Sequence, residues 1–287
     1  MGIDITMAIG EEAQRTVDEV MLEALPVVPP PRGFATWRAA GMWVADQLAL
    51  VGAGYSVIPT GSLCHGTAGG VHSGLDLLVM QQVSSLVSLD PKQAVAQLGR
   101  RLNAEDNDTT TKGWRIKNVR VGTVCLIPAV FLQHTTRLMV PDANQNGWVA
   151  TMPEKHAAAL QAMTDIQRCA IRFLGSSDAM ASWSHFAVEA VAIEAFSGKS
   201  YLEHFHWALK GWLDTAAEIL QAGPSHPLTS VIASASRGDV AELVASLERV
   251  RELADRAWFM QEVDDGKGDF KEIVGCYLMI LDPLLGR

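Results

Sequence analysis

A glycine-rich stretch that ends in a single acid most constrains how this chain can fold. Residues 61–80 read GSLCHGTAGGVHSGLDLLVM and follow the apolar residues 55–59. Glycines let backbone N–H groups approach an anion, and Asp76 lies within an apolar run typical of a buried strand. A turn at Gly61 and Ser62 followed by an acid on a strand can present phosphate and metal ligands at one sheet edge. We therefore expect Asp76 to face a bound Mg²⁺ ion here.

One of the carboxylates that the expected metal site needs is absent from this stretch. A two-metal site needs carboxylates clustered on one strand and its neighbour. The position two residues before Asp76 is Gly74, so that the expected Asp-x-Asp reads Gly-Leu-Asp. Phosphoryl-transfer chemistry would require more acids than this strand supplies.

The stretch resembles the signature of the polymerase-beta-like nucleotidyltransferases, in which Gly-Ser precedes Gly-Thr or Gly-Ser and then Ser-Asp-x-Asp on a strand. The matching residues are Gly61, Ser62, Gly66, Thr67, Ser73 and Asp76. The branch that it most resembles is the CD-NTases, bacterial makers of cyclic oligonucleotide signals in anti-phage defence, which are similar to animal oligoadenylate synthases. The resemblance implies that the first five of these residues bind nucleotide phosphates and that Asp76 is a catalytic metal ligand.

A second segment resembles the strand that carries the third acid in the same branch. Residues 123–130 read TVCLIPAV, where the branch usually reads apolar-Asp-apolar-apolar-Pro-Ala, and Cys125 stands at the position of the acid. With Gly74, two of the three metal-binding acids are replaced and Asp76 alone remains. The resemblance therefore implies a nucleotidyltransferase fold with a degenerate active site, in which Mg²⁺ binding is weak.

Two departures from the family pattern fall in the second half of the chain. Where a helix of the family usually reads apolar-apolar-Lys-x-Trp, this chain has residues 172–174 followed by Gly175. Residues 184–189 resemble a serine-containing motif that ends in Glu, but His185 occupies the usual serine register. These departures imply that groups which grip phosphate or stack on a base are altered as well.

Composition and charge indicate which binding partners and which cellular compartment suit the chain. The 287 residues are 48% hydrophobic and 19% charged, which suffices for a sizeable core, and the formal net charge of −9 argues against broad DNA or RNA binding. The four cysteines contain no CxxC pair, which favours reduced thiols in a cytoplasmic protein. The N-terminal region has no signal-peptide pattern, and no apolar run is long enough to span a membrane.

The order of patterns along the chain predicts an α+β protein. We expect a mixed-sheet lobe with N-terminal spine helices over residues 1–152, packed against an all-helical lobe over residues 153–287. In the first lobe, the expected helices are 4–24, 34–50 and 91–102, and the expected strands lie near 55–59, 75–80, 114–121 and 124–132, with a loop at 139–151. In the second lobe, the expected helices are 154–174, 180–197, 201–221, 240–261 and 270–281.

These patterns leave three functions open. The first is a pseudoenzyme that binds a nucleotide, an RNA or a protein partner, in bacterial anti-phage nucleotide signalling. The second is an active metal-dependent nucleotidyltransferase with unusual ligands, which makes a cyclic or linear oligonucleotide or modifies a partner. The third is a structural partner of an active nucleotidyltransferase, in a homo- or hetero-oligomer.

Overall fold

A computed structural model describes most of the chain. The described residues are 16–50, 54–69, 74–81, 90–101, 113–131, 137–142, 146–199, 202–236, 239–263 and 270–281. Contacts group the chain into two compact units. We call residues 28–66 and 71–161 the sheet unit, and residues 1–27, 67–70 and 162–287 the helical unit. The domain boundary expected between residues 152 and 153 stays a prediction.

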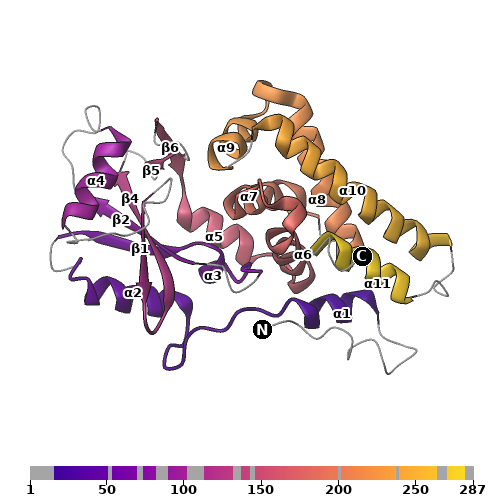
Figure 1. The fold of residues 1–287 in the computed structure, drawn as a ribbon, viewed down its shortest axis with the longest axis horizontal. Helices are drawn as coiled ribbons and strands as arrows, with labels where there is room; N and C mark the ends of the chain where they lie inside the picture. The colour runs from indigo at the N-terminus through magenta and orange to yellow at the C-terminus, as the bar shows by residue number, and fades with distance from the viewer. Residues whose placement is uncertain are drawn as a thin grey trace. The chain divides into compact units, whose positions relative to one another are not determined.

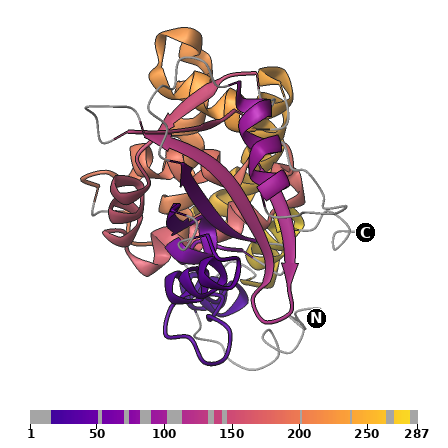
Figure 2. The ribbon, with the colours of Figure 1, turned by 90° about the vertical axis from the view of Figure 1, so that its left-hand side faces the viewer.

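A mixed sheet of six strands forms the centre of the sheet unit (Figure 1). The strands are β1 (Ser56–Thr60), β2 (Leu75–Gln81), β3 (Trp114–Asn118), β4 (Gly122–Phe131), β5 (Leu138–Pro141) and β6 (Trp148–Thr151). Their order is β1-β2-β4-β5-β6, and β3 pairs with β4. Among the described strands, β2 and β4 alone run parallel, and the β3–β4 hairpin is visible in Figure 2. A central parallel pair is normally covered on both faces, which explains why Leu77, Leu78 and Val79 are all buried.

Four helices belong to the part of the sheet unit that the structure describes. They are α2 (Trp37–Gln47), α3 (Ser62–His65), α4 (Pro91–Arg101) and α5 (Pro153–Gln161). Helix α2 packs on β1 and β2, and α4 packs on β4 and β5. The side chain of Thr36 accepts a hydrogen bond from the Ala39 amide and so caps α2. The short helix α3 contacts β1, β2 and α5, and it holds the turn at Gly61 against the sheet.

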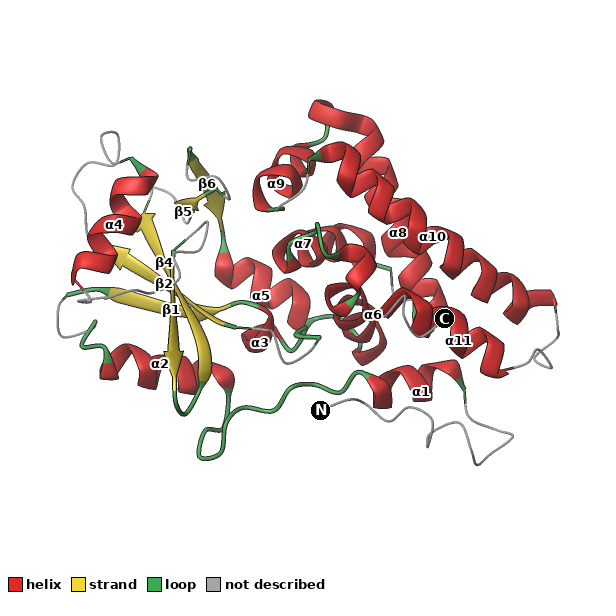
Figure 3. Cartoon of the chain, in the orientation of Figure 1, coloured by secondary structure: helices red, strands yellow, loops and turns green. Residues whose placement is uncertain are grey.

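The helical unit contains the remaining long helices (Figure 3). They are α1 (Val17–Ala24), α6 (Asp165–Ser176), α7 (His185–Phe196), α8 (Phe205–Ala222), α9 (Pro227–Ala235), α10 (Val240–Val263) and α11 (Phe270–Leu281). Phe173, Phe205 and Tyr277 meet edge to face in its core, with ring centroids 5.3–6.1 Å apart. Among the described residues, no helix combines the length and apolar character needed to cross a membrane.

The α+β class is confirmed, but two element predictions were wrong and one helix was not predicted. The helix expected over residues 154–174 is divided into α5 and α6, because Thr164 and Gln167 form a capping box that begins a new helix. Residues 139–151 contain the hairpin strands β5 and β6 rather than a loop. Helix α9 occupies a region that the sequence analysis left without an element.

Candidate functional site

Asp76 and Cys125 lie directly opposite each other on neighbouring parallel strands. Strand β2 pairs with β4 so that Asp76 is the Cα partner of Cys125, and Asp76 also faces Thr60 across the antiparallel β1–β2 pair. Side chains of paired residues point to the same face of a sheet. The carboxyl group of Asp76 and the thiol of Cys125 therefore share one face, and both residues are half-buried.

The turn at Gly61 lies against the carboxyl group of Asp76. Gly61 has φ +86° and ψ 175°, a conformation almost restricted to glycine. A Cβ atom placed on Gly61 would lie 2.5 Å from Oδ2 of Asp76. Ser62 begins α3, and Gly66 ends it in the left-handed conformation with φ +72°. The structure thus brings Gly61 and Asp76 together, with Ser62 next in the chain.

The two positions at which the resemblance predicts acids, Gly74 and Cys125, lie near this carboxyl group. Gly74 immediately precedes β2, and a Cβ atom there would be in ordinary contact with Thr123, 3.5 Å from its carbonyl oxygen and 3.6 Å from Cγ2. Crowding therefore does not require glycine at position 74. Ser73, the fifth expected phosphate ligand, lies outside the described residues.

The side chains at this strand pair are a poor donor set for Mg²⁺. Magnesium prefers oxygen ligands in octahedral geometry, and a thiol is a soft ligand that suits other metals. At the paired positions the only carboxylate is that of Asp76, while Cys125 supplies sulfur and Gly74 supplies no side chain. The arrangement does not fit a two-metal Mg²⁺ site built on three carboxylates.

Thr67 belongs to a buried polar cluster in the helical unit. Its hydroxyl donates a short hydrogen bond to Oε1 of Glu189 in α7. His185 Nε2 lies 3.3 Å from Oγ1 of Thr67 and 3.7 Å from Oε1 of Glu189. Thr67 is 0% exposed and Glu189 is 2% exposed. This hydroxyl, expected to bind phosphate, is therefore used to hold the chain after Gly66 against α7.

The same region explains the two departures from the family pattern in the second half of the chain. A Cβ atom on Gly175 would collide with the imidazole of His185. The ring from α7 therefore occupies the space that a side chain at position 175 in α6 would need. The two departures are linked in space, because the presence of His185 requires a glycine at position 175.

Arg172, three residues before Gly175 in α6, is committed to the core of the helical unit. It is 2% exposed, and its Nε donates a 2.7 Å hydrogen bond to the carbonyl oxygen of Leu25. Burial lowers the pKa of Arg172, and burial raises the pKa of the nearby Cys169 thiol to about 11. Arg172 thus ties α6 to the end of α1 and is not presented to solvent as a phosphate ligand.

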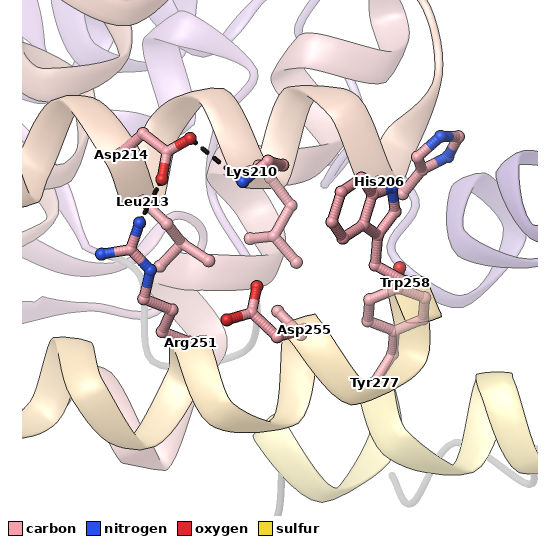
Figure 4. A pocket seen from close by; sticks show the side chains of 10 residues that line it. His206, Lys210, Leu213, Asp214, Arg251, Asp255, Trp258 and Tyr277 are labelled. Atoms are coloured by element: carbon pink, nitrogen blue, oxygen red, sulfur yellow. Dashed lines mark hydrogen bonds and ion pairs between the residues drawn. The ribbon is translucent and has the colours of Figure 1, made fainter. Parts of the chain in front are cut away.

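A shallow groove lies between α8 and α10 of the helical unit, with Tyr277 of α11 at one end (Figure 4). Lys210 and Arg251 both pair with Asp214, and the Lys210 ammonium lies 5.0 Å from the ring centroid of Trp258. The enclosed volume is about 10 Å³, close to the space of one water molecule. A groove of this size does not accommodate a nucleotide.

The fold defined by this sheet and these helices is that of the CD-NTase-like nucleotidyltransferases. Among solved structures, Escherichia coli MS115-1 CdnC with ATP is similar, with a TM-score of 0.62, 14% identity and coverage of 92% of this chain and 96% of that one. The Bradyrhizobium diazoefficiens CD-NTase CdnG in complex with GTP gives a TM-score of 0.61, 12% identity and coverage of 90% and 97%. No protein-family model and no curated protein matches the sequence.

The sequence predicted the strand pair of Asp76 and Cys125 but not the buried polar cluster of Thr67 and Glu189. The predicted relation between Gly61, Asp76 and Cys125 rests on motifs that are each local in the chain. Thr67 and Glu189 are 122 residues apart, and no local pattern indicates their contact. The resemblance to the CD-NTases did indicate both segments, 61–80 and 184–189, but not that they meet through a hydrogen bond.

Proposed function

We propose that this chain is a catalytically degenerate CD-NTase-like protein, a pseudoenzyme that binds a nucleotide without transferring it. The observation that carries the proposal is the pairing of Asp76 with Cys125, which leaves one carboxylate at the strand pair. Phosphoryl transfer depends on metal ions that neutralise charge on the reacting phosphate. A single carboxylate beside a thiol is a weak holder of Mg²⁺, and Mg²⁺ would be bound mainly through the phosphates of the nucleotide.

A nucleotide is favoured over the other ligand classes. Two of the similar solved structures contain GTP or ATP, and the turn at Gly61 and Ser62 that would contact phosphate is kept beside Asp76. The net charge of −9 disfavours RNA. A protein partner has its own support, because another similar structure is a complex of CdnC with HORMA-deltaN. A role in anti-phage nucleotide signalling, alone or beside an active nucleotidyltransferase in the cytoplasm, follows from the resemblance.

Binding and transfer are tested separately on the full chain. We expect ATP or GTP with Mg²⁺ to raise the melting temperature, because a ligand that binds only the folded state stabilises it. Incubation with labelled nucleoside triphosphates and Mg²⁺ or Mn²⁺ is expected to give no product. A product that the wild type makes and Asp76→Ala does not make would overturn the proposal in favour of an active enzyme. No shift with any triphosphate would overturn nucleotide binding and leave the protein partner.

Restoring the acids sharpens this test. We expect the double variant Gly74→Asp/Cys125→Asp to gain Mn²⁺-dependent stabilisation, because three carboxylates then share one sheet edge. We expect it to remain without transferase product, because Arg172, Gly175 and His185 are committed to packing within the helical unit. Transfer activity in this variant would show that the helical unit is still competent.

A further inference from the structure

Two imidazole rings lie beside each other in the sheet unit. His65 is the last residue of α3 and His156 is the fourth residue of α5, and these two helices contact each other. The ring centroids are 5.3 Å apart and the ring planes are inclined by 45°. A ring nitrogen of His65 lies within 4.8 Å of a ring nitrogen of His156. The pair is formed by packing rather than by spacing in one helix.

This separation is close to what one metal ion requires. Histidine nitrogen binds Zn²⁺ at about 2.0–2.1 Å in tetrahedral geometry, so two nitrogens on one ion are about 3.4 Å apart. The ring nitrogens of His65 and His156 lie within 4.8 Å of each other, so they must approach by at most about 1.4 Å. Because the χ2 torsion of histidine is broad, a small rotation of either ring is enough to bring both nitrogens to the ion.

The ring of His65 is buried beside a hydroxyl group, whereas the ring of His156 is partly exposed. His65 is only 8% exposed, and its Nε2 lies 3.3 Å from Oγ1 of Thr60 on β1. Neighbouring polar groups of this kind restrain the orientation of metal-binding histidines. His156 is half-buried, so that solvent reaches one side of the pair. One ligand is thus held by the sheet and the other is accessible to an entering ion.

We propose that His65 and His156 bind a Zn²⁺ ion in the sheet unit, with water completing the coordination. Imidazole nitrogen suits Zn²⁺, whereas Mg²⁺ takes oxygen ligands. The Zn²⁺ site therefore differs in chemistry from the magnesium site expected at Asp76. Neither its occupation nor its test depends on whether the chain binds a nucleotide.

The test is a titration of the purified full chain with Zn²⁺, by calorimetry and by competition with a chromophoric chelator. We expect one Zn²⁺ per chain, and a loss of affinity of at least tenfold in His156→Gln and in His65→Gln. His156→Cys is expected to keep the affinity within a few-fold, because a thiolate is also a zinc ligand. Substituting Co²⁺ and recording its X-ray absorption should reveal two imidazole nitrogens in the wild type.

A matched control is available in the helical unit. His204 and His206 also form a ring pair, with centroids 5.8 Å apart, and His206→Gln should leave Zn²⁺ affinity unchanged. Melting temperatures in EDTA identify any variant that fails to fold, and His156→Gln, which changes the more exposed ring, is the decisive one. The proposal is wrong if the wild type binds no Zn²⁺, if both His156→Gln and His65→Gln retain full affinity, or if His206→Gln loses as much as they do.

Discussion

Buried polar side chains are concentrated in the helical unit and are nearly absent from the sheet unit. Of the nine buried polar or charged side chains among the described residues, eight belong to the helical unit and only His65 to the sheet unit. Several of those of the helical unit hydrogen-bond to distant segments: Ser177 donates to the carbonyl oxygen of Ile280, and Arg172 donates to that of Leu25. The sheet unit satisfies its buried polar groups mainly through its backbone ladder.

This difference predicts where the chain tolerates substitution. Where backbone pairing defines the architecture, as at β2 and β4, a half-buried side chain such as that of Cys125 can be exchanged without disturbing the register. Where side-chain hydrogen bonds define the architecture, as at Thr67 and Glu189, a single replacement removes the hydrogen bond of a buried polar group. We expect substitutions to cost more in the helical unit than at the strand pair.

The largest effect is expected for Glu189→Ala. The substitution leaves the buried hydroxyl of Thr67 without its acceptor and should lower the free energy of unfolding by about 3 kcal/mol. Urea denaturation followed by circular dichroism measures this change. Glu194→Ala, on an exposed position of the same helix, should stay within about 0.5 kcal/mol. Equal effects of the two variants would contradict the importance of the buried cluster.

The next largest effect is expected for a substitution of Gly61, at the strained turn beside Asp76 in the sheet unit. Gly61→Ala should cost about 2 kcal/mol, because it adds a Cβ atom 2.5 Å from Oδ2 of Asp76 to a backbone with φ +86°. Gly54 has φ +83° but nothing within 4 Å of its Cβ position, so Gly54→Ala should cost only about 1 kcal/mol. The same denaturation assay applies. Gly61→Ala should be less harmful in an Asp76→Ala background than in the wild type, because the carboxyl group that the added Cβ atom meets is then absent.

A smaller effect should appear as a pH dependence of the helical unit. Burial lowers the pKa of His206 from 6.5, outweighing Asp18, which raises it. The folded state therefore binds fewer protons than the unfolded state, and stability is present above pH 6.5 and is lost as the pH falls through the lowered pKa. Melting temperatures measured across this range should fall less steeply in His206→Gln. Parallel slopes for both proteins would exclude His206 as their cause.

The smallest effect is expected for Gly74→Ala. Since a Cβ atom at this position meets Thr123 only at ordinary contact distances of 3.5–3.9 Å, the change in the free energy of unfolding should stay within about 0.5 kcal/mol. A cost above about 1.5 kcal/mol would show that the strand pair depends on its side chains as much as the helical unit does, and the comparison would fail.

The sequence predicted the centre of the sheet but not its far edge. Residues 124–130 form a continuous apolar run of strand length, and residues 75–80 are apolar except for Asp76; their pairing followed from the resemblance. Strands β5 and β6 have only four residues each, which is too short for alternation to be distinguished from a loop. The helix break before Asp165 was visible in principle, since Thr164 and Gln167 have the spacing of a capping box.

The candidate site was predictable only where its parts are local in the chain. Gly61, Asp76 and Cys125 lie in two short motifs, so that fold resemblance was enough to bring them together. The buried hydrogen bond of Thr67 was not predictable, because its partner Glu189 is 122 residues away. The contact between Gly175 and His185 depends on how α6 packs against α7, and neither residue carries a signal for it on its own.

The hydrogen bonds between α6 and α1 join segments that are synthesised at very different times. Cys169 and Arg172 donate hydrogen bonds to the carbonyl oxygens of Met21 and Leu25, which precede them by 148 and 147 residues. At ribosomal rates of about 5–20 residues per second, α1 emerges roughly 7–30 s before these donors exist. Helix α1 thus leaves the ribosome well before its partners in α6 are synthesised, and its backbone carbonyl groups stay without these donors throughout that interval.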